Sequence, residues 1–391
     1  MYPFCSLHCE TTPYSVFENI EHIQEKWDHL LPENHHLKSE NLLILQKTKP
    51  EHISFKYIII EENQKPIGLA YLQLLNFNSR HYNNDLLNKP KLERIKSHII
   101  KQQTNLLICG NLFRTNFQGF YFKHAKDNSL ILGVLKNFAK KNPFKINFTG
   151  VLLKDCDIQF DEKEFKRHRY ESFMNDITMY VPIKNVWSTF EDYLGELSRK
   201  YLQRAKKIRL AKESVDVKEL NLAAITANGA RIEELYLQVA SRQSIKMGIL
   251  NAQYFIEMKK SLGDSFKLTG YYFEEKLVAF SSYIIDGESI EIHYIGFDSK
   301  YNEQCKLYFN IIFDGIETAI NNGMCSVELG RTALEAKASA GGIPVYNKNY
   351  IWVKLGLPTI VYNFFNKQYS NNLSEEWKNR FPFKEAPVTA Q

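Results

Sequence analysis

Two cations near the end of the sequence have positions from which they could bind or stabilise negative charge. Lys337 follows a short β-rich run and a turn, where a fixed cation could stabilise developing negative charge. Arg331 comes directly after Gly330, where a guanidinium could clamp a phosphate or a carboxylate. The simpler alternatives are a solvent-facing helix lysine and an ion pair of Arg331 with Glu328 or Glu335.

The segment around these cations, with the glycine pair that follows it, is typical of a substrate-binding loop. Glu335 lies between Arg331 and Lys337, and the two cations could converge on one anion. Gly341 and Gly342 can adopt backbone conformations closed to other residues, so the chain can turn sharply and pass close to a substrate. We predict that the substrate-binding residues here are Arg331, Glu335, Gly341 and Gly342.

A second group of candidate catalytic residues lies on a predicted strand and on the helix after it. Glu291 and His293 are two residues apart, so on a strand their side chains share one face. The pKa of a histidine suits acid–base catalysis near neutral pH. Tyr308 on the next helix could complete the group. The alternative is a half-buried, hydrogen-bonded pair without a catalytic role.

A basic amphipathic helix is predicted near the start of the C-terminal half. Its apolar stripe consists of Leu194, Leu197, Tyr201, Ala205 and Ile208. Its cations, which do not share one face, are Arg199, Lys200, Arg204, Lys206, Lys207, Arg209 and Lys212. We interpret Arg204 and Lys207 as substrate-binding residues on a surface for tRNA, a nucleotide-linked precursor or an anionic membrane. The alternative is a solvated charged face.

The elements that would position these residues occur twice. Residues 55–74 and 267–285 each contain two β-rich runs around a polar turn, which is the pattern of a hairpin. Each hairpin is followed by a strand, a helix and a strand: Leu106–Gly110, Leu130–Lys141 and Phe144–Leu153 in the first half, and Ser289–Phe297, Cys305–Asn321 and Ser326–Leu329 in the second. This order predicts an α/β fold of the α+β type, with two tandem domains that each contain a mixed sheet flanked by helices. The alternative is a chance likeness of two common hairpins.

The two halves are not separated by a Gly/Ser-rich linker. A charged stretch leads into a predicted strand at Asp176–Val181, and we place the boundary just before that strand. The expected domains are residues 1–170 and 171–385, with a tail at 386–391. We expect the second domain to carry the better-preserved active site.

Composition limits the possible classes of protein. Of the 391 residues, 44% are hydrophobic, as in globular proteins, and the net charge of +6 is compatible with an anionic partner without requiring one. The six cysteines show no regular pairing, which indicates reduced thiols. The N-terminus lacks the features of a signal peptide, and no apolar run approaches the ~18 residues needed to span a bilayer. We therefore expect a cytoplasmic protein.

No metal site is predicted. Cys5, His8 and Cys9, together with His35 and His36, have a faintly metal-like pattern. A zinc site needs four well-spaced ligands, usually in paired short motifs, and this segment does not supply them.

The order of hairpin, strand, helix and strand resembles the GNAT acyltransferase superfamily. Two tandem copies resemble the Fem-type peptidoglycan aminoacyltransferases and their FemAB-like relatives. The segments that carry this resemblance are Val327–Gly342, with its Lys-x-x-x-Gly stretch, and the helix Leu197–Lys207. The resemblance covers residues 185–365 well and 20–155 in outline. It implies a degenerate N-terminal GNAT-like domain and an acyl or aminoacyl transfer to an amine, possibly in cell-envelope biogenesis. It also implies an oxyanion-stabilising role for Lys337.

One departure from the GNAT pattern bears on the donor. GNAT enzymes that bind acyl-CoA carry an Arg/Gln-x-x-Gly-x-Gly/Ala turn, whose backbone cradles the pyrophosphate. Here the turn spans Asp298–Cys305 and has no glycine, and in the first half Arg114–Phe120 is only a partial match. The departure disfavours acyl-CoA and fits the aminoacyl-tRNA donor that the Fem-like resemblance implies. We expect no bound cofactor and no DNA partner. The alternatives are a CoA-dependent N-acetyltransferase and a non-catalytic, ligand-binding GNAT-like module.

Overall fold

The computed structural model describes residues 12–77, 104–141, 146, 148–156, 158–243, 248–354 and 378–385. The chain forms two compact units. Of the described residues, those from 12 to 77, from 104 to 173 and from 348 to 354 belong to the first unit, and the others to the second. The predicted division into the continuous segments 1–170 and 171–385 differs from these units, because residues 348–354 belong to the first unit. Cys5, His8, Cys9 and the predicted tail at 386–391 lie outside the described residues.

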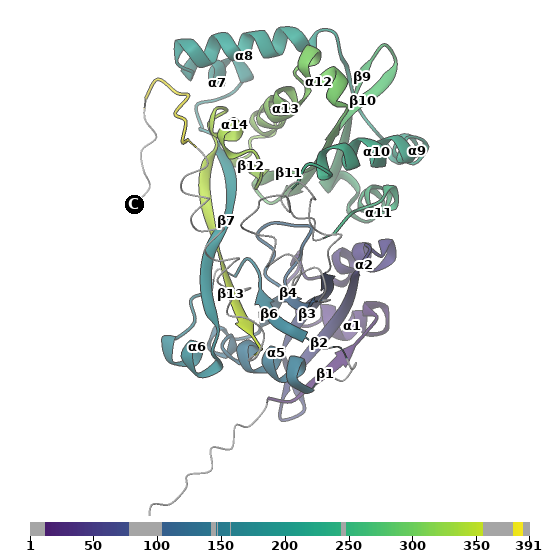
Figure 1. The fold of residues 1–391 in the computed structure, drawn as a ribbon, viewed down its shortest axis with the longest axis vertical. Helices are drawn as coiled ribbons and strands as arrows, with labels where there is room; N and C mark the ends of the chain where they lie inside the picture. The colour runs from purple at the N-terminus through teal and green to yellow at the C-terminus, as the bar shows by residue number, and fades with distance from the viewer. Residues whose placement is uncertain are drawn as a thin grey trace, which may run out of the picture. The chain divides into compact units, whose positions relative to one another are not determined.

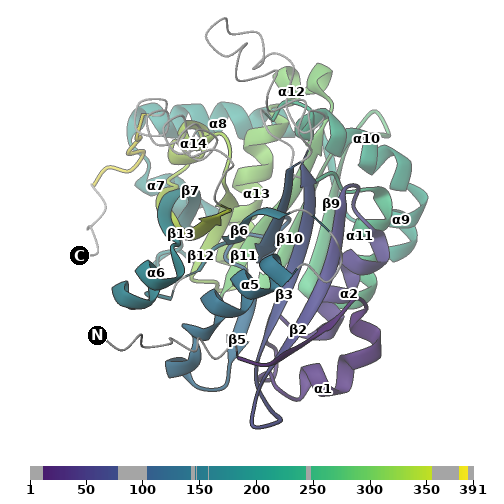
Figure 2. The same cartoon turned by 60° about the horizontal axis from the view of Figure 1, so that its bottom comes forward.

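The first unit contains a mixed sheet with helices on both faces. The strands follow the order β1-β2-β3-β4-β6-β13, and β5 pairs with β3. They are β1 (Tyr14–Phe17), β2 (Ile53–Glu62), β3 (Lys65–Phe77), β4 (Thr104–Cys109), β5 (Phe120–Phe122), β6 (Phe148–Leu153) and β13 (Ile343–Val353). The helices are α1 (Gln24–Asp28), α2 (Ser39–Thr48), α5 (Leu130–Lys141) and α6 (Glu162–His168), with short 3₁₀ turns at Ile20–Ile23 and Ala125–Asp127. Figure 2 shows α1 and α2 on one side of β2 and β3, with α5 on the other.

The second unit contains a second mixed sheet, in the order β8-β9-β10-β11-β12-β7. Its strands are β7 (Glu171–Pro182), β8 (Asp216–Glu219), β9 (Phe266–Phe273), β10 (Lys276–Asp286), β11 (Ser289–Phe297) and β12 (Ser326–Gly330). Its helices are α7 (Phe190–Glu196), α8 (Arg199–Lys212), α9 (Leu222–Ala227), α10 (Gly229–Ala240), α11 (Ala252–Leu262), α12 (Ser299–Cys305), α13 (Leu307–Asn321) and α14 (Leu334–Ala338), with a 3₁₀ turn at Gly263–Ser265. Figure 1 shows α9–α11 on the side of β9–β11 that faces away from α13.

The predicted repetition is confirmed by the strand pairing. In each sheet the first three pairings are antiparallel, the fourth is parallel (β4 with β6, β11 with β12), and the last is antiparallel. The last strand of each sheet comes from elsewhere in the chain, because β13 completes the first sheet and β7 completes the second. The chain therefore contains two copies of one α/β unit, as the hairpin pattern predicts.

The hairpin turns explain why this pattern is visible in the sequence. The two residues between β2 and β3, Asn63 and Gln64, have φ angles of 48° and 65°, and Glu274 and Glu275 between β9 and β10 have the same values. Positive φ at both central residues is what a two-residue type I′ turn requires. The predicted helix at Cys305–Asn321 differs in detail: Lys306 has a φ of 49°, so α12 ends at Cys305 and α13 begins at Leu307.

The core of the second unit lies between one face of its sheet and the helices α7, α8 and α13. Ile290 and Ile292 of β11 and Val327 and Leu329 of β12 are buried in it. Because side chains alternate along a strand, the residues between them point to the opposite face. Among the described residues, no helix is long and apolar enough to cross a bilayer.

Candidate functional site

The sheet of the second unit opens where its two central parallel strands separate. β11 and β12 are paired only from Ser289 to Glu291 and from Ser326 to Glu328. Beyond this point β11 continues to Phe297, whereas β12 stays with β7. In the first unit, β4 remains paired with β6 up to Cys109, its last residue. The separation exposes strand edges in the second sheet at a position where the described part of the first sheet is closed.

A β-bulge lies beside this opening. The register between β10 and β11 shifts so that His293 and Tyr294 both lie opposite Ser282. The Ser282 hydroxyl fills the bulge: it donates to the Tyr294 carbonyl and accepts from the Tyr294 N–H, each at 3.0 Å. β3 and β4 of the first unit pair without a shift. Bulges change the direction in which side chains point and are common next to active sites, so the second unit differs from the first at two adjacent places.

A row of polar side chains crosses the sheet at the opening. Glu291 of β11 lies in register with Glu328 of β12, which lies in register with Tyr180 of β7. The Tyr180 hydroxyl donates to Glu328 Oε2 at 2.7 Å. Glu291 and Glu328 are both buried, and they point away from the apolar core. Buried carboxylates are costly unless they are paired, so this row indicates a site rather than ordinary packing.

Glu291 and His293 share one face of β11, as predicted, and they are hydrogen-bonded to each other. His293 Nδ1 lies 2.6 Å from Glu291 Oε1, and the imidazole is almost fully buried. The other ring nitrogen, Nε2, lies 2.7 Å from the hydroxyl of Tyr254 on α11. With Glu291 ionised, the imidazole donates through Nδ1 and accepts the Tyr254 proton at Nε2. The three residues therefore form one hydrogen-bonded chain from the sheet to α11.

The tyrosine predicted for this group, Tyr308, is the wrong one. Its ring packs against Phe297 and Phe309, and its hydroxyl has no hydrogen-bond partner among the described residues. Tyr254 takes its place, although it lies 39 residues before His293 in the sequence. No local pattern indicated Tyr254, because its position depends on how α11 packs on the sheet.

Lys337 is buried, so the alternative of a solvent-facing helix lysine is wrong. Its side chain is folded back beneath the strand end, where a Cβ at Gly330 would lie 3.7 Å from Nζ. Lys337 is only 6% exposed. Burial lowers its pKa to about 7, although the carboxylate of Glu328 acts to raise it. At neutral pH the amine can therefore both give and take a proton.

Glu335 is engaged elsewhere, whereas the convergence of Arg331 and Lys337 on one anion stays a prediction. Glu335 is exposed, and its carboxylate accepts two hydrogen bonds from the guanidinium of Arg380. Arg331 is half-buried and lies near Tyr294. Burial raises the pKa of Tyr294, and the charge of Arg331 acts to lower it. Arg331 thus belongs near the bulge, whereas Glu335 belongs to the outer surface of α14.

The glycine pair has a structural reason. Gly341 has a φ of +94°, and a Cβ there would lie 2.7 Å from the ring of Phe383. A Cβ at Gly342 would lie 2.9 Å from the carbonyl oxygen of Lys337. Internal packing therefore requires both glycines, and their contact with a substrate stays a prediction.

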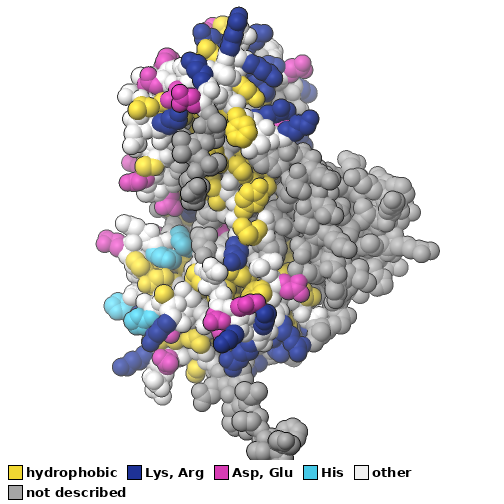
Figure 3. Space-filling view, turned by 90° about the vertical axis from the view of Figure 1, so that its left-hand side faces the viewer, with side chains coloured by type: hydrophobic (Ala, Val, Ile, Leu, Met, Phe, Trp, Pro, Cys, Tyr) yellow, Lys and Arg dark blue, Asp and Glu magenta, His cyan; other side chains and the backbone are white. Residues whose placement is uncertain are grey.

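The cations of the basic helix, α8, fall into an exposed group and a paired group. Ala205 and Ile208 of the predicted apolar stripe are buried, as expected. The guanidinium of Arg204 lies 4.5 Å from the ring centre of Phe309, and Lys207 is exposed. The exposed cations of α8 are Arg199, Lys200, Arg204, Lys206 and Lys207. Lys and Arg side chains are frequent in the upper part of Figure 3.

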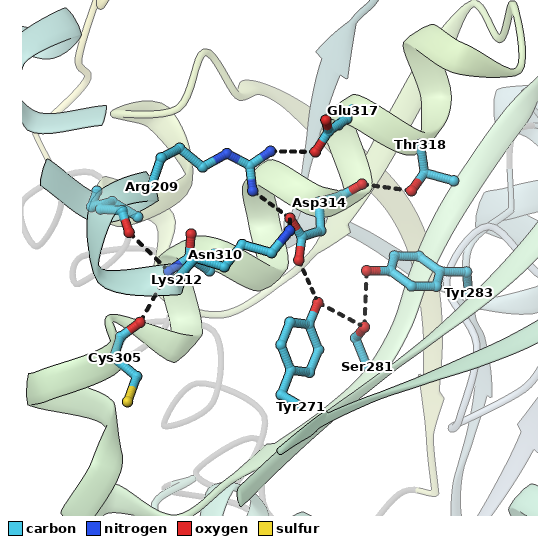
Figure 4. A network of polar contacts seen from close by, with 11 residues as sticks. Arg209, Lys212, Tyr271, Ser281, Tyr283, Cys305, Asn310, Asp314, Glu317 and Thr318 are labelled. Atoms are coloured by element: carbon cyan, nitrogen blue, oxygen red, sulfur yellow. Dashed lines mark hydrogen bonds and ion pairs between the residues drawn. The ribbon is translucent and has the colours of Figure 1, made fainter. Parts of the chain in front are cut away.

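The other two cations of α8, Arg209 and Lys212, are half-buried and paired. Arg209 pairs with Asp314 and, at 2.5 Å, with Glu317, while Lys212 lies 2.7 Å from Asp314 (Figure 4). The hydroxyl of Tyr271 donates to the other oxygen of Asp314 at 2.9 Å. The buried carboxylate of Asp314 is thus neutralised by two cations and a hydroxyl, and this network fastens α8 to α13.

Comparisons with known proteins give one matching family and several structures of similar fold. A model of the FemAB-like family, described as peptidoglycan biosynthesis/recognition, matches residues 138–385. The crystal structure of FemX matches with a TM-score of 0.50 and 10% identity, over 90% of this chain and 100% of that one. A tandem GNAT protein from the clavulanic acid biosynthesis pathway has a TM-score of 0.48 at 8% identity, over 87% and 98% of the two chains. The sequences of curated proteins give no significant match.

The repeated mixed sheet, with its bulge and separated strands, defines a duplicated α/β fold. The family model covers more than half of the chain, and the protein belongs to the FemAB-like family. That family is one of peptidoglycan biosynthesis or recognition.

Proposed function

We propose that the second unit transfers an aminoacyl group from an anionic, tRNA-type donor to an amine, at the opening between β11 and β12. The observation that carries this proposal is the group at the opening: the buried pair Glu291 and Glu328, the His293–Tyr254 chain behind Glu291, and the buried amine of Lys337. A buried lysine with a lowered pKa beside buried, hydrogen-bonded carboxylates is typical of catalytic sites.

In the proposed reaction, Glu291 acts as the base and Lys337 stabilises the oxyanion. The attacking amine forms a bond with the carbonyl carbon and passes a proton to Glu291, whose charge His293 and Tyr254 hold in place. Lys337 in its charged form stabilises the oxyanion. When the ester bond breaks, the leaving oxygen takes a proton from Lys337. A lysine with a pKa of about 7 suits this step, because proton transfer is most efficient when the pKa lies near the working pH.

The start of α12 favours such a donor over acyl-CoA. This is where a CoA-dependent GNAT enzyme would bind pyrophosphate on bare backbone N–H groups. Here the carboxylate of Asp298 caps the helix, accepts from the N–H of Lys300 at 3.1 Å, and pairs with Arg231 at 3.2 Å. A buried carboxylate in this position repels a pyrophosphate and already uses the N–H group that would hold it.

The exposed cations of α8 supply a surface for the anionic partner. Arg204 and Lys207 belong to this surface, whereas Arg209 and Lys212 are neutralised by Asp314. We take the partner to be tRNA, with an anionic membrane as the alternative, and we place the reaction in the cytoplasm, where aminoacyl-tRNA is available. A peptidoglycan precursor with a free amine is the proposed acceptor.

Transfer assays with aminoacyl-tRNA and with acetyl-CoA test the reaction. We expect turnover with the tRNA donor and its loss, by about a hundredfold or more, in Glu291→Gln and Lys337→Met. Lys126→Met, at an exposed position of the first unit away from the proposed site and from α8, is the matched control for the lysine. Turnover with acetyl-CoA alone would support the CoA-dependent reading. Tight tRNA binding without turnover in the natural protein would support a non-catalytic module.

Salt dependence tests the surface. The double variant Arg204→Gln/Lys207→Gln is expected to weaken tRNA binding. The slope of log affinity against log salt concentration should fall by the equivalent of up to about two phosphate contacts. Lys300→Gln, an exposed lysine at the start of α12, is the control. If the double variant loses binding to anionic vesicles but binds tRNA as the natural protein does, the surface belongs to a membrane.

A further inference from the structure

A segment near the C-terminus of the chain packs against the helix that carries Lys337. Residues 380–384, which we call the C-terminal strap, run beside the junction of α7 and α8. Leu197 and Phe383 form an antiparallel bridge. The N–H of Ser198 donates to the carbonyl of Pro382 at 2.8 Å, and the N–H of Lys384 donates to that of Glu196 at 2.9 Å. The strap is therefore fixed by its backbone to the end of α7.

The side chain of Phe383 reaches from this anchor to the turn after α14. Its ring centre lies 5.9 Å from those of Trp187 and Tyr193. The ring covers Gly341 so closely that a Cβ there would lie 2.7 Å from it. A side chain at residue 341 would thus displace the ring, and only glycine allows this contact.

The covered turn is the one that closes α14. The carbonyl oxygen of Lys337 accepts from the N–H of Ala340 at 3.0 Å and from that of Gly342 at 2.9 Å. The carbonyl of Ala340 in turn accepts from the hydroxyl of Tyr193 at 3.0 Å. The backbone of Lys337 is therefore held by a turn that is pressed between the ring of Phe383 and the sheet.

The strap also contacts the outer surface of α14. Arg380 pairs with Glu335, two residues before Lys337. This pair is exposed and contributes little by itself. Arg380 thus contacts α14 before Lys337, and Phe383 contacts the turn that follows α14.

We propose that the C-terminal strap is a positioning device: Phe383, through Gly341 and the turn after α14, holds the amine of Lys337 in its buried place beneath Gly330. The contacts of Phe383 within the described part of the chain include Gly341, Trp187 and Tyr193, and through Gly341 it acts on Lys337. The charged group that faces the amine is Glu328 on β12. On the outer side of α14, the charges of Glu335 and Arg380 neutralise each other. This inference rests on the proposed role of Lys337, but its test does not.

Labelling of Lys337 by an amine-reactive reagent measures its position without any donor or acceptor. The rate is followed against pH by mass spectrometry of the peptide. The midpoint reports the pKa of the amine, and the plateau at high pH reports its accessibility. In the natural protein we expect a midpoint near 7 and a low plateau. In Phe383→Ala we expect the midpoint to rise by at least ~1 pH unit toward the ordinary lysine value of about 10.4. We expect the plateau to rise about tenfold or more.

Three further variants separate positioning from loss of the fold. Phe383→Leu keeps an apolar side chain but lacks the ring edge over Gly341, and it replaces Phe383→Ala should that variant fail to fold. Gly341→Ala displaces the same contact from the other side and is expected to have the same effect on labelling. Phe381→Ala, in the same strap at a side chain that is 58% exposed, is the matched control and should behave as the natural protein.

The outcomes distinguish this proposal from the proposed function. An unchanged midpoint and plateau in folded Phe383 and Gly341 variants would overturn the positioning role. If those variants shift the labelling of Lys337 while Lys337→Met retains full turnover, the strap holds the lysine but the proposed chemistry fails. If labelling shifts and turnover falls together, both stand.

Discussion

Replacing Lys337 with methionine is expected to abolish turnover and, at neutral pH, to stabilise the fold. The reason is the cost of keeping a cation-forming group in a dry place. Burial lowers the pKa of Lys337 from 10.5 to about 7, and each pH unit of difference between the folded and unfolded states corresponds to about 1.4 kcal/mol. The ceiling on the cost is therefore about 5 kcal/mol, as an order of magnitude.

The expected gain is smaller than this ceiling. Methionine keeps most of the apolar volume of the lysine stem, but it also removes the cation that faces Glu328. Glu328 retains its hydrogen bond from Tyr180. We expect Lys337→Met to raise the free energy of unfolding by about 2 kcal/mol at pH 6 to 7.

The pH dependence distinguishes this cause from a general packing effect. Below pH 7 both states of the natural protein carry the proton, and the folded state bears the full cost. Between pH 7 and about 10.4 the unfolded state still binds the proton that the folded state has lost, so the stability of the natural protein rises with pH in this window. The advantage of the methionine variant should therefore fade as the pH approaches 10.

Urea titrations at pH 6.5, 8 and 9.5 measure this difference directly. Lys206→Met, at an exposed position of α8, is the matched control and should change stability by less than about 0.5 kcal/mol. A methionine variant that is less stable than the natural protein at pH 6.5, or a difference that does not vary with pH, would refute the buried-amine reasoning.

Three further outcomes follow from single contacts. Tyr254→Phe removes the hydroxyl that bonds His293 and should lower turnover about tenfold or more with a shifted pH profile. Tyr308→Phe should leave turnover unchanged, because its hydroxyl has no partner among the described residues. Equal effects of the two variants would contradict the assignment of Tyr254. Arg209→Gln leaves Asp314 short of a cation and should destabilise the fold by about 3 kcal/mol in thermal or urea unfolding, with tRNA affinity unchanged in the folded protein. Gly296→Ala would place a Cβ 2.6 Å from the backbone of α10 and should yield little folded protein on expression; normal yield and stability would show that the strand can shift.

The repeated architecture could be derived from the sequence. Hairpin turns and alternating strands are local signals, and the two turns have the same φ angles because the same two-residue geometry is required at both. The pairing of Glu291 with His293 followed from the same period of two. The absence of glycine at 298–305 was equally visible, and it corresponds to a helix capped by Asp298.

The sequence did not reveal which charged side chains are buried. Lys337 and Arg209 resemble exposed cations when read along their helices, yet one lies in the interior and the other pairs with Asp314, more than 100 residues away in the sequence. The sequence also did not reveal that Tyr254, rather than Tyr308, bonds His293, or that Phe383 covers Gly341. Both contacts join segments that are far apart in the chain. Local periodicity specifies strands, helices and the face on which a side chain lies. What meets that face, and therefore the pKa and the chemistry of the side chain, depends on contacts between segments far apart in the chain, and only the tertiary structure decides them.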